Sequence, residues 1–252
     1  MCKMEKDMTN IFGIRAIIES IESGSTINKI YLQKGLRGEL FFELDKLIKQ
    51  NNVTTSIVPV EKLNRLSKNN NHQGAVAQIS PIDFYDLEKL IEKTIDNKEI
   101  PLFLLLDQIS DVRNFGAIIR TAECTGVHGI IIQKNGSAPV NAETIKTSAG
   151  AAFKIPICKV DHIKDALFLL QASDIKIVAA TEKTEDSIFD INFNQPLAIV
   201  MGSEHRGVNP SILKMVDYKA KLPLLGEIAS LNVSVACGAF LYETVRQRIS
   251  VK

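Results

Sequence analysis

The sequence predicts an α/β protein built on a parallel sheet, and two observations carry this prediction. Short apolar runs alternate with helix-like stretches, and a polar turn that contains glycine follows several of the runs. Alternation of this kind favours a parallel sheet that is covered on both faces. The strand candidates are Leu102–Asp107, Gly129–Gln133, Ile155–Lys159, Ile175–Ala180, Leu197–Met201 and Tyr218–Leu222. The helix candidates are Gly116–Cys124, Asn141–Ser148, His162–Gln171, Asn209–Met215 and Asn232–Ser250.

The first 80 residues predict a separate, smaller α/β unit with the character of an αβα sandwich. Apolar spacing predicts helices and strands in the order helix Ile11–Ser23, strand Lys29–Gln33, helix Glu39–Gln50 and strands Val53–Val58 and Ala75–Ile79. The segment 81–99 is charged, with a modest helical pattern, and we expect it to be a linker. The predicted organisation is therefore a unit at 1–80, a linker at 81–99 and a main domain at 100–252.

Composition narrows the class of protein. Hydrophobic residues make up 45% of the chain and charged residues 23%, which is typical of a soluble globular protein. No run approaches the length of a membrane span, and the polar start lacks the apolar core of a signal peptide, so we expect a cytoplasmic protein. Cys124, Cys158 and Cys237 lie in apolar runs without metal-ligand spacing, which predicts buried free thiols and no metal site.

Charge gives only a weak indication of a partner. The formal net charge is +1, with +3 in residues 1–80 and −2 in the remainder. Such a distribution does not by itself predict a nucleic-acid partner.

The first segment of chemical interest is NFGAIIR, from Asn114 to Arg120, which follows the strand candidate that ends at Asp107. We expect Asn114 before or at the cap of the next helix, so that it and Arg120 both reach a site at the end of the strand. The alternative is an ordinary N-cap asparagine and a surface arginine. An arginine in an apolar stretch needs an anionic partner, and a phosphate suits its planar fork.

The second segment, MGSEHRG, runs from Met201 to Gly207 after another strand candidate. Gly202 permits close approach of the backbone to a ligand. The segment lacks the glycine fingerprints of dinucleotide and triphosphate sites, which disfavours a nicotinamide-dependent enzyme and a nucleotide hydrolase.

The third segment, LPLLGEIASLNVSVA, runs from Leu222 to Ala236. A loop that contains Ser230 and Asn232 precedes an apolar helix with a face of small residues. Ser230 or Asn232 can cap that helix, and the small residues permit close packing against a partner or within the core.

Together, the three segments resemble the motif set of the SpoU family of RNA ribose 2'-O-methyltransferases, in the SPOUT superfamily. The resemblance covers about Leu102 to Arg248. The stretches FGIRA at Phe12 and HQGAVA at His72 are similar to the substrate-binding domain of the bacterial 23S rRNA guanosine-2'-O-methyltransferases. The resemblance as a whole implies a C-terminal domain with a deep trefoil knot and a ribosomal-protein-like (L30e-like) RNA-binding fold at the N-terminus. It also implies a homodimer whose active sites are completed near the subunit interface.

The resemblance also implies a cofactor and roles for residues. S-adenosylmethionine is held by Gly202, Leu222 and Leu231, largely through backbone groups. Arg120 activates the ribose hydroxyl, either as a base or as a charged group that holds a phosphate and stabilises the alkoxide. The remaining matched polar positions are Asn114, Glu204, Ser230 and Asn232. The two asparagines are expected to position the substrate, and Glu204 is expected to hold Arg120 or the loop. The resemblance adds RNA phosphates as partners for Arg246 and Arg248; the alternative is solvated cations at the end of a helix.

The resemblance predicts 2'-O-methylation of a guanosine in the P-loop of the 23S rRNA peptidyl-transferase centre. The partner is then 23S rRNA or a ribosome-assembly intermediate. The same chemistry on a tRNA or at another rRNA site is the close alternative, and a non-catalytic RNA-binding protein is the alternative of a different class.

Overall fold

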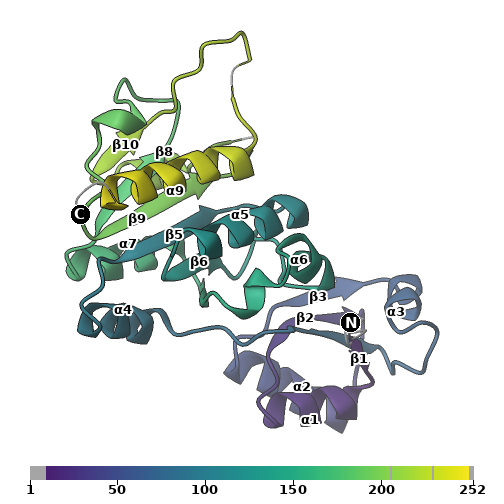
Figure 1. Cartoon of the computed structure of the whole chain (residues 1–252). Coiled ribbons are helices and arrows are strands. Elements are labelled where there is room, and N and C mark those ends of the chain that lie inside the picture. The colour runs from purple at the N-terminus through teal and green to yellow at the C-terminus, as the bar shows by residue number, and fades with distance from the viewer. Residues whose placement is uncertain (1–9, 205, 229, 250–252) are drawn as a thin grey trace, which may run out of the picture. The chain divides into compact units, whose positions relative to one another are not determined.

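The computed structural model describes residues 10–204, 206–228 and 230–249, which form two compact units (Figure 1). The first unit comprises the described residues up to Asp83 together with Val140–Ala142. The second comprises Phe84–Pro139 and the described residues from Glu143 onward. Each unit has its own hydrophobic core.

The first unit is a four-stranded sheet in the order β1-β4-β2-β3, in which β2 and β3 are parallel and the other pairs are antiparallel. Ile17 of α1 and Leu44 of α2 pack with Ile30 on one face, and Leu63 of α3 packs with Val76 on the other. The elements are β1 (Asn10–Phe12), α1 (Ile14–Glu22), β2 (Ile27–Gln33), α2 (Glu39–Gln50), β3 (Thr55–Val58), α3 (Val60–Leu66) and β4 (Ala75–Ile79).

Two elements of this unit differ from the sequence prediction. The expected helix from Ile11 begins only at Ile14, because Asn10–Phe12 pairs with β4 as a strand and Gly13 turns the chain at φ +93°. An apolar residue at position 11 fits both periodicities, and the strand pairing decides between them. Helix α3 was not predicted, because its seven residues bury only Leu63.

The second unit is a sheet of six strands in the order β10-β8-β9-β5-β6-β7, and every described pair is parallel. Side chains of α4 and α7 pack on one face, whereas α5 and α9 pack against each other on the opposite face (Figure 1). The strands are β5 (Leu102–Asp107), β6 (Gly129–Gln133), β7 (Ile157–Val160), β8 (Lys176–Ala180), β9 (Leu197–Gly202) and β10 (Tyr218–Ala220). The helices are α4 (Leu87–Asp96), α5 (Val112–Cys124), α6 (Ala142–Thr147), α7 (Ile163–Ala172), α8 (Pro210–Leu213) and α9 (Val233–Ile249), with short 3-10 turns at Ala151–Phe153 and Ile188–Asp190.

The predicted α/β class with a parallel sheet is confirmed, and all six strand candidates are strands of this sheet. Leu102–Leu106 are buried along the whole strand, as expected for a central strand covered on both faces. The last helix ends at Ile249 within the described residues, and the expected end at Ser250 lies outside them. The knot and the L30e-like character of the first unit stay predictions.

The segment 81–99, expected as a linker, contains α4. Leu87, Leu90 and Ile91 of this helix are buried in the core of the second unit beside Phe103. Asp86 caps the helix by accepting a hydrogen bond from the backbone amide of Lys89. The domain boundaries at 80 and 100 stay predictions, with α4 packed as part of the second unit.

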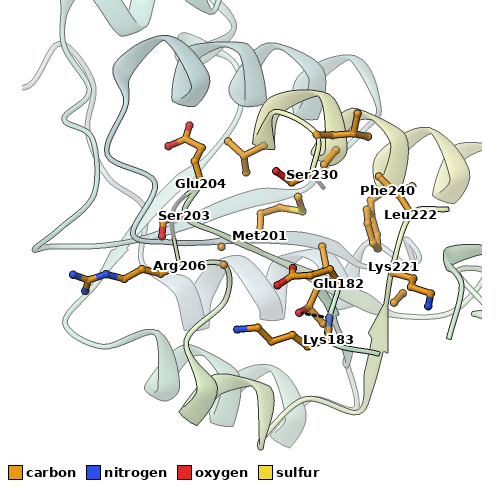
Figure 2. A pocket seen from close by; sticks show the side chains of 18 of the residues that line it. Glu182, Lys183, Met201, Ser203, Glu204, Arg206, Lys221, Leu222, Ser230 and Phe240 are labelled. Atoms are coloured by element: carbon orange, nitrogen blue, oxygen red, sulfur yellow. Dashed lines mark hydrogen bonds between the residues drawn. The ribbon is translucent and has the colours of Figure 1, made fainter. Parts of the chain in front are cut away.

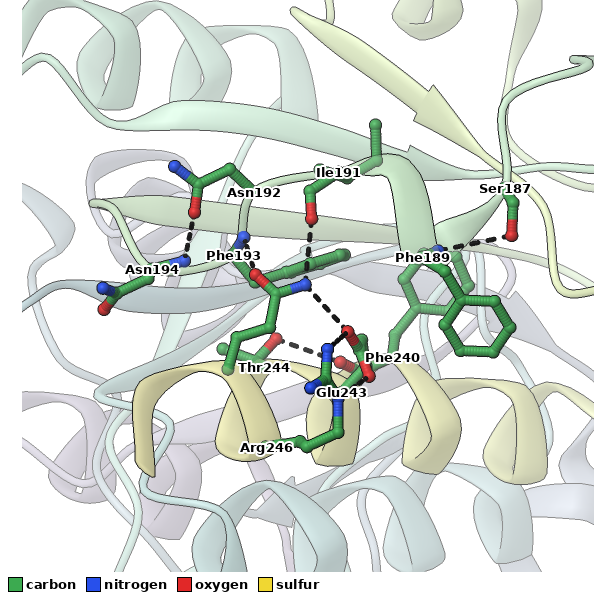
Figure 3. Close-up of polar contacts among 11 residues, drawn as sticks. Ser187, Phe189, Ile191, Asn192, Phe193, Asn194, Phe240, Glu243, Thr244 and Arg246 are labelled. Atoms are coloured by element: carbon green, nitrogen blue, oxygen red, sulfur yellow. Dashed lines mark hydrogen bonds and ion pairs between the residues drawn. The ribbon is translucent and has the colours of Figure 1, made fainter. Parts of the chain in front are cut away.

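A polar network fastens α9 to the segment after the Ile188–Asp190 turn (Figure 3). The Gln247 amide donates to the carbonyl oxygen of Ile191 at 2.9 Å and to Glu243 at 2.8 Å, and its oxygen accepts from the amide of Phe193 at 2.7 Å. Arg246 donates two hydrogen bonds to the Glu243 carboxylate, at 2.8 and 2.7 Å. The helix end is therefore held by side chains that reach a neighbouring loop.

Arg248 has a structural role in this unit. Its guanidinium donates to the carbonyl oxygens of Ile100, Pro101 and Gln195 at 2.8 to 2.9 Å, and burial lowers its pKa to about 10. Both sequence-based interpretations, an RNA contact and a solvated cation, are therefore wrong for Arg248.

We predict that Glu243→Gln destabilises the protein above pH 4.5 and has little effect in strong acid. Hydrogen bonds from Arg246 lower the pKa of the Glu243 carboxyl below 4.5, assisted by Gln247 and opposed by burial. A lowered folded-state pKa adds stability that is present above the unfolded value and is lost as the pH falls through the folded value. Urea unfolding at neutral pH should show a loss of about 1–3 kcal/mol. Glu185→Gln, at a 99% exposed side chain, is the control and should change little. An undiminished difference near pH 2 would contradict the assignment.

Cys158 and Cys237 are buried, and desolvation raises the pKa of each thiol to about 12. The prediction of a buried thiol is wrong for Cys124, which is exposed because it ends α5 on the outer side of the helix.

No helix in the described part of the chain has the length and apolar character to cross a membrane. Within the same residues, no cluster of three or more metal-ligating side chains occurs.

Candidate active site

A cavity of about 400 Å³ lies at the carboxyl ends of β8, β9 and β10 (Figure 2). Its inner wall is apolar and its rim carries charged side chains from the loops that follow these strands. The apolar lining residues are Ala180, Met201, Ala220, Leu222, Leu224, Leu231, Val233, Ala236 and Phe240. The polar and glycine lining residues are Thr181, Glu182, Lys183, Gly202, Ser203, Glu204, Arg206, Gly207, Lys221 and Ser230. Carboxyl ends of parallel strands are where open α/β sheets bind ligands.

Gly202 is required by the backbone of the loop that follows it. A Cβ atom at this position would lie 2.1 Å from the carbonyl carbon of Gly207 and from the amide nitrogen of Val208. The loop closes on itself, because the amide of Gly207 donates to the carbonyl oxygen of Ser203 at 2.8 Å. The absence of a side chain at Gly202 thus allows this loop to fold over the end of β9 and form one wall of the cavity.

Beside the cavity, one hydrogen-bond network joins all three sequence segments. Asn114 of α5 donates through Nδ2 to Oε1 of Glu204, which follows β9. Asn232, at the start of α9, donates through Nδ2 to Oδ1 of Asn114 at 3.1 Å. Oδ1 of Asn232 accepts from the amide and the hydroxyl of Ser234 at 2.8 and 2.6 Å. Residues 90 and 118 positions from Asn114 are therefore brought into contact with it.

The position of Asn114 differs from the expectation. Helix α5 begins at Val112, so Asn114 lies within its first turn, and Asp111 is the cap. The Asp111 carboxylate accepts from the amides of Arg113 and Asn114 at 2.9 Å. The Asn114 side chain is consequently free of a capping role and bonds to Glu204 and Asn232 instead.

Arg120 does not line the cavity within this chain. Since Asn114 and Arg120 both lie on α5, their side chains point roughly 120° apart around the helix axis, at 3.6 residues per turn. Arg120 is exposed, and no hydrogen bond or ion pair joins its side chain to another residue in the described part of the chain. The expectation that Asn114 and Arg120 reach one site is therefore not met within a single chain.

The residues predicted to hold the cofactor all line the cavity. Gly202 is buried at the end of β9, whereas Leu222 and Leu231 come from the loop between β10 and α9, as does the exposed Ser230. Their roles stay predictions.

Sequence reasoning missed two groups around the site. Thr181, Glu182 and Lys183 follow β8 and line the cavity, and a polar turn directly after a buried strand is the signal that could have found them. Asp107, 3% exposed at the end of β5, accepts from the amide of Asn209 at 2.8 Å, and burial raises the pKa of its carboxyl. It thereby holds the far end of the loop that follows Gly202.

Comparison with known proteins finds a matching family for each of the two parts of the chain. The family described as the SpoU rRNA Methylase family matches residues 101–242, and the family described as RNA 2'-O ribose methyltransferase substrate binding matches residues 10–85. A Bacillus subtilis (strain 168) protein named for the TrmH family of tRNA/rRNA methyltransferases, YacO, is 31% identical, and the match covers 97% of this chain and 98% of that protein. A Staphylococcus haemolyticus protein named for the same family is 33% identical, with 96% of each chain covered. The SpoU methyltransferase AviRb of Streptomyces viridochromogenes, solved with AdoMet, is 25% identical at a TM-score of 0.62, covering 96% of this chain and 90% of that one.

The fold, the cavity and these matches define an RNA methyltransferase. The chain belongs to the SpoU rRNA methylase family. The cofactor of the family is S-adenosylmethionine, with which a relative has been solved. The cavity fits this group, since its volume of about 400 Å³ lies in the range of small-molecule sites and it combines an apolar wall with a few polar groups.

Proposed function

We propose that the protein methylates the ribose 2'-hydroxyl of a guanosine in the P-loop of 23S rRNA. The observation that carries the proposal is the hydrogen-bond network through Asn114, Glu204 and Asn232 at the edge of the cavity. These side chains come from three separate segments and form one polar surface beside a site that fits the cofactor. A fold kept only for binding RNA has no need of this arrangement.

The side chains then have distinct roles. S-adenosylmethionine, when bound, supplies an electrophilic methyl group. Asn114 and Asn232 position the ribose, because each amide is itself fixed by a hydrogen bond. Glu204 holds Asn114 and the loop after β9, and Ser230 adds a hydroxyl at the rim.

Arg120 is the group we propose to act on the nucleophile. A guanidinium keeps its proton at neutral pH, so a fixed positive charge that binds a phosphate and stabilises the developing alkoxide explains its role without a proton transfer to the side chain. Loss of a single charge-stabilising donor of this kind typically costs about 10²–10³ in kcat.

We also propose a homodimer in which Arg120 completes the site of the partner subunit. Arg120 is exposed, and it lies outside the cavity of its own chain. Helix α9 carries an apolar stripe at a spacing of seven residues, Val235, Tyr242 and Ile249, with exposed fractions of 57, 58 and 64%. A stripe of this kind favours burial against another helix. Two of the small residues of α9 face parts of their own chain, since Gly238 faces Thr121 of α5 and Ala236 lines the cavity.

The first unit supports an RNA substrate, because the substrate-binding family matches it over residues 10–85, and the rRNA methylase family that matches residues 101–242 favours ribosomal RNA. A tRNA or another rRNA site, approached with the same chemistry, is the second candidate, since the relatives are named for both classes of RNA. Incubation with tritiated S-adenosylmethionine and a panel of unmodified 23S rRNA, precursor ribosomal particles and tRNA distinguishes them. Label at one P-loop guanosine is the expected result. Label on tRNA alone would replace the proposed substrate, and cofactor binding without label on any RNA would favour the binding-only alternative.

We predict that a chain beginning at Phe84 still binds S-adenosylhomocysteine but loses RNA selection. The cavity is lined only by residues of the second unit, whose core is separate from that of the first. Calorimetry should therefore give a dissociation constant within about threefold of the full-length value. Methyl transfer to 23S rRNA should fall at least tenfold, by roughly 1.4 kcal/mol or more in kcat/KM. If the shortened protein modified the same nucleotide equally well, the first unit would have no part in recognition.

A further inference from the structure

We propose that Lys183 and Glu182, in the turn after β8, bind the charged amino-acid end of the cofactor. Lys183 pairs with its carboxylate and Glu182 with its α-ammonium group. This inference rests on the proposed function, because it concerns the same cavity. It makes the turn after β8 the element that distinguishes S-adenosyl amino acids from other adenosine thioethers.

The first argument is the division of the cavity into an apolar and a charged part. Met201, Leu222 and Phe240 are apolar and form its inner wall (Figure 2). An adenine ring suits such a wall, whereas a zwitterion does not, because burial of a charge without a partner is costly. The amino-acid end of the cofactor is therefore expected at the charged rim.

The second argument is that the other three charged residues of the rim have a partner or extend elsewhere. The Lys221 ammonium lies 2.9 Å from the Glu185 carboxylate. Glu204 accepts a hydrogen bond from Asn114. Arg206 extends away from the other labelled side chains in Figure 2.

Glu182 and Lys183 are the remaining rim charges among the described lining residues. Neither the Glu182 carboxylate nor the Lys183 ammonium forms a hydrogen bond or ion pair within the described part of the chain, and both side chains are exposed. The backbone of the turn is fixed, because the amide of Lys183 donates to the hydroxyl of Thr181 at 3.2 Å. Two adjacent side chains of opposite sign, held at the mouth of the cavity, match the paired charges of an amino acid.

The test compares two ligands by isothermal titration calorimetry. S-adenosylhomocysteine carries the amino-acid end, and 5'-methylthioadenosine has the same adenosine thioether without it. For Lys183→Met and Glu182→Gln we expect about three- to tenfold weaker binding of S-adenosylhomocysteine, the size of a charge-assisted contact at a partly exposed site. Binding of 5'-methylthioadenosine should change less than about twofold.

Lys176→Met is the matched control, since it removes the same charge from the opposite end of β8, where Lys176 pairs with Asp217 at 3.2 Å. It should leave both dissociation constants unchanged. Thermal melts of each variant check that folding is retained, and Lys183→Glu, which reverses the charge, should lower S-adenosylhomocysteine affinity further than Lys183→Met.

Equal weakening of both ligands, or no weakening of either, would overturn the inference while leaving the proposed function intact. Wild-type protein that binds neither nucleoside would overturn the inference and the proposed function together.

Discussion

Replacement of Arg120 by alanine is expected to reduce methyl transfer by at least about 10²-fold in kcat, with no more than a twofold change in the affinity for S-adenosylhomocysteine. The position of Arg120 explains why turnover and cofactor affinity should respond differently. Arg120 lies outside the cavity of its own chain and is exposed, so its loss removes a charge from the reacting centre without disturbing the cofactor wall. Single-turnover assays with saturating cofactor measure the first quantity, and calorimetry measures the second.

Arg113→Ala is the matched control, because Arg113 is a second exposed arginine on α5. It should retain near-normal turnover. Arg120→Lys separates two properties of the side chain, since lysine keeps the charge but loses the planar fork. Undiminished turnover in Arg120→Ala would remove this residue from the mechanism.

A dimer-based complementation test follows from the same placement. If Arg120 of one subunit completes the site of the other, mixed dimers of Arg120→Ala with a variant impaired in the cofactor cavity should recover up to about a quarter of wild-type activity in a random mixture. Recovery requires that both defects fall in the same site of the mixed dimer, which leaves its other site intact. Absence of recovery in confirmed mixed dimers would contradict completion by the partner.

Gly202→Ala is expected to abolish detectable cofactor binding, with a loss of more than about 100-fold in affinity and about 1–3 kcal/mol in the free energy of unfolding. The added Cβ would lie 2.1 Å from two backbone atoms, at Gly207 and Val208, and neither can move as a side-chain end does. The loop after β9 must shift, and with it one wall of the cavity. Calorimetry with S-adenosylhomocysteine and urea unfolding measure the two effects.

Gly226→Ala tests whether the effect is specific to this close contact. Gly226 lies in the loop between β10 and α9, and a Cβ there meets no atom within 4 Å. This variant should bind the cofactor like the wild type. Normal binding by Gly202→Ala would mean that the loop adopts another path and that the cavity described above is not the cofactor site.

The strands of the second unit were accessible to sequence reasoning because the central ones are buried on both faces. Leu102–Asp107 reads as a continuous apolar run, and its bounds agree with β5. The short strand at Asn10–Phe12 was not accessible, since its assignment depends on pairing with β4, more than sixty residues away. Local periodicity carries no information on such a pairing.

The site was predictable in part for a similar reason. Motif resemblance selected Asn114, Glu204 and Asn232, but the hydrogen bonds among them arise only from the fold. Arg248 was misread because nothing in its neighbours along the chain shows that four backbone carbonyl groups surround its guanidinium. Lys183 was overlooked because a single polar turn after a strand is common in any α/β protein.

The central claim is that the protein transfers a methyl group to a ribose hydroxyl, and mass spectrometry of nucleosides tests it most directly. Unmodified 23S rRNA is incubated with the protein and S-adenosylmethionine carrying a deuterated methyl group, and is then digested to nucleosides. The account predicts a labelled 2'-O-methylguanosine whose label lies on the ribose after loss of the base. Label on the base, or RNA without label under conditions where the cofactor binds, would contradict it.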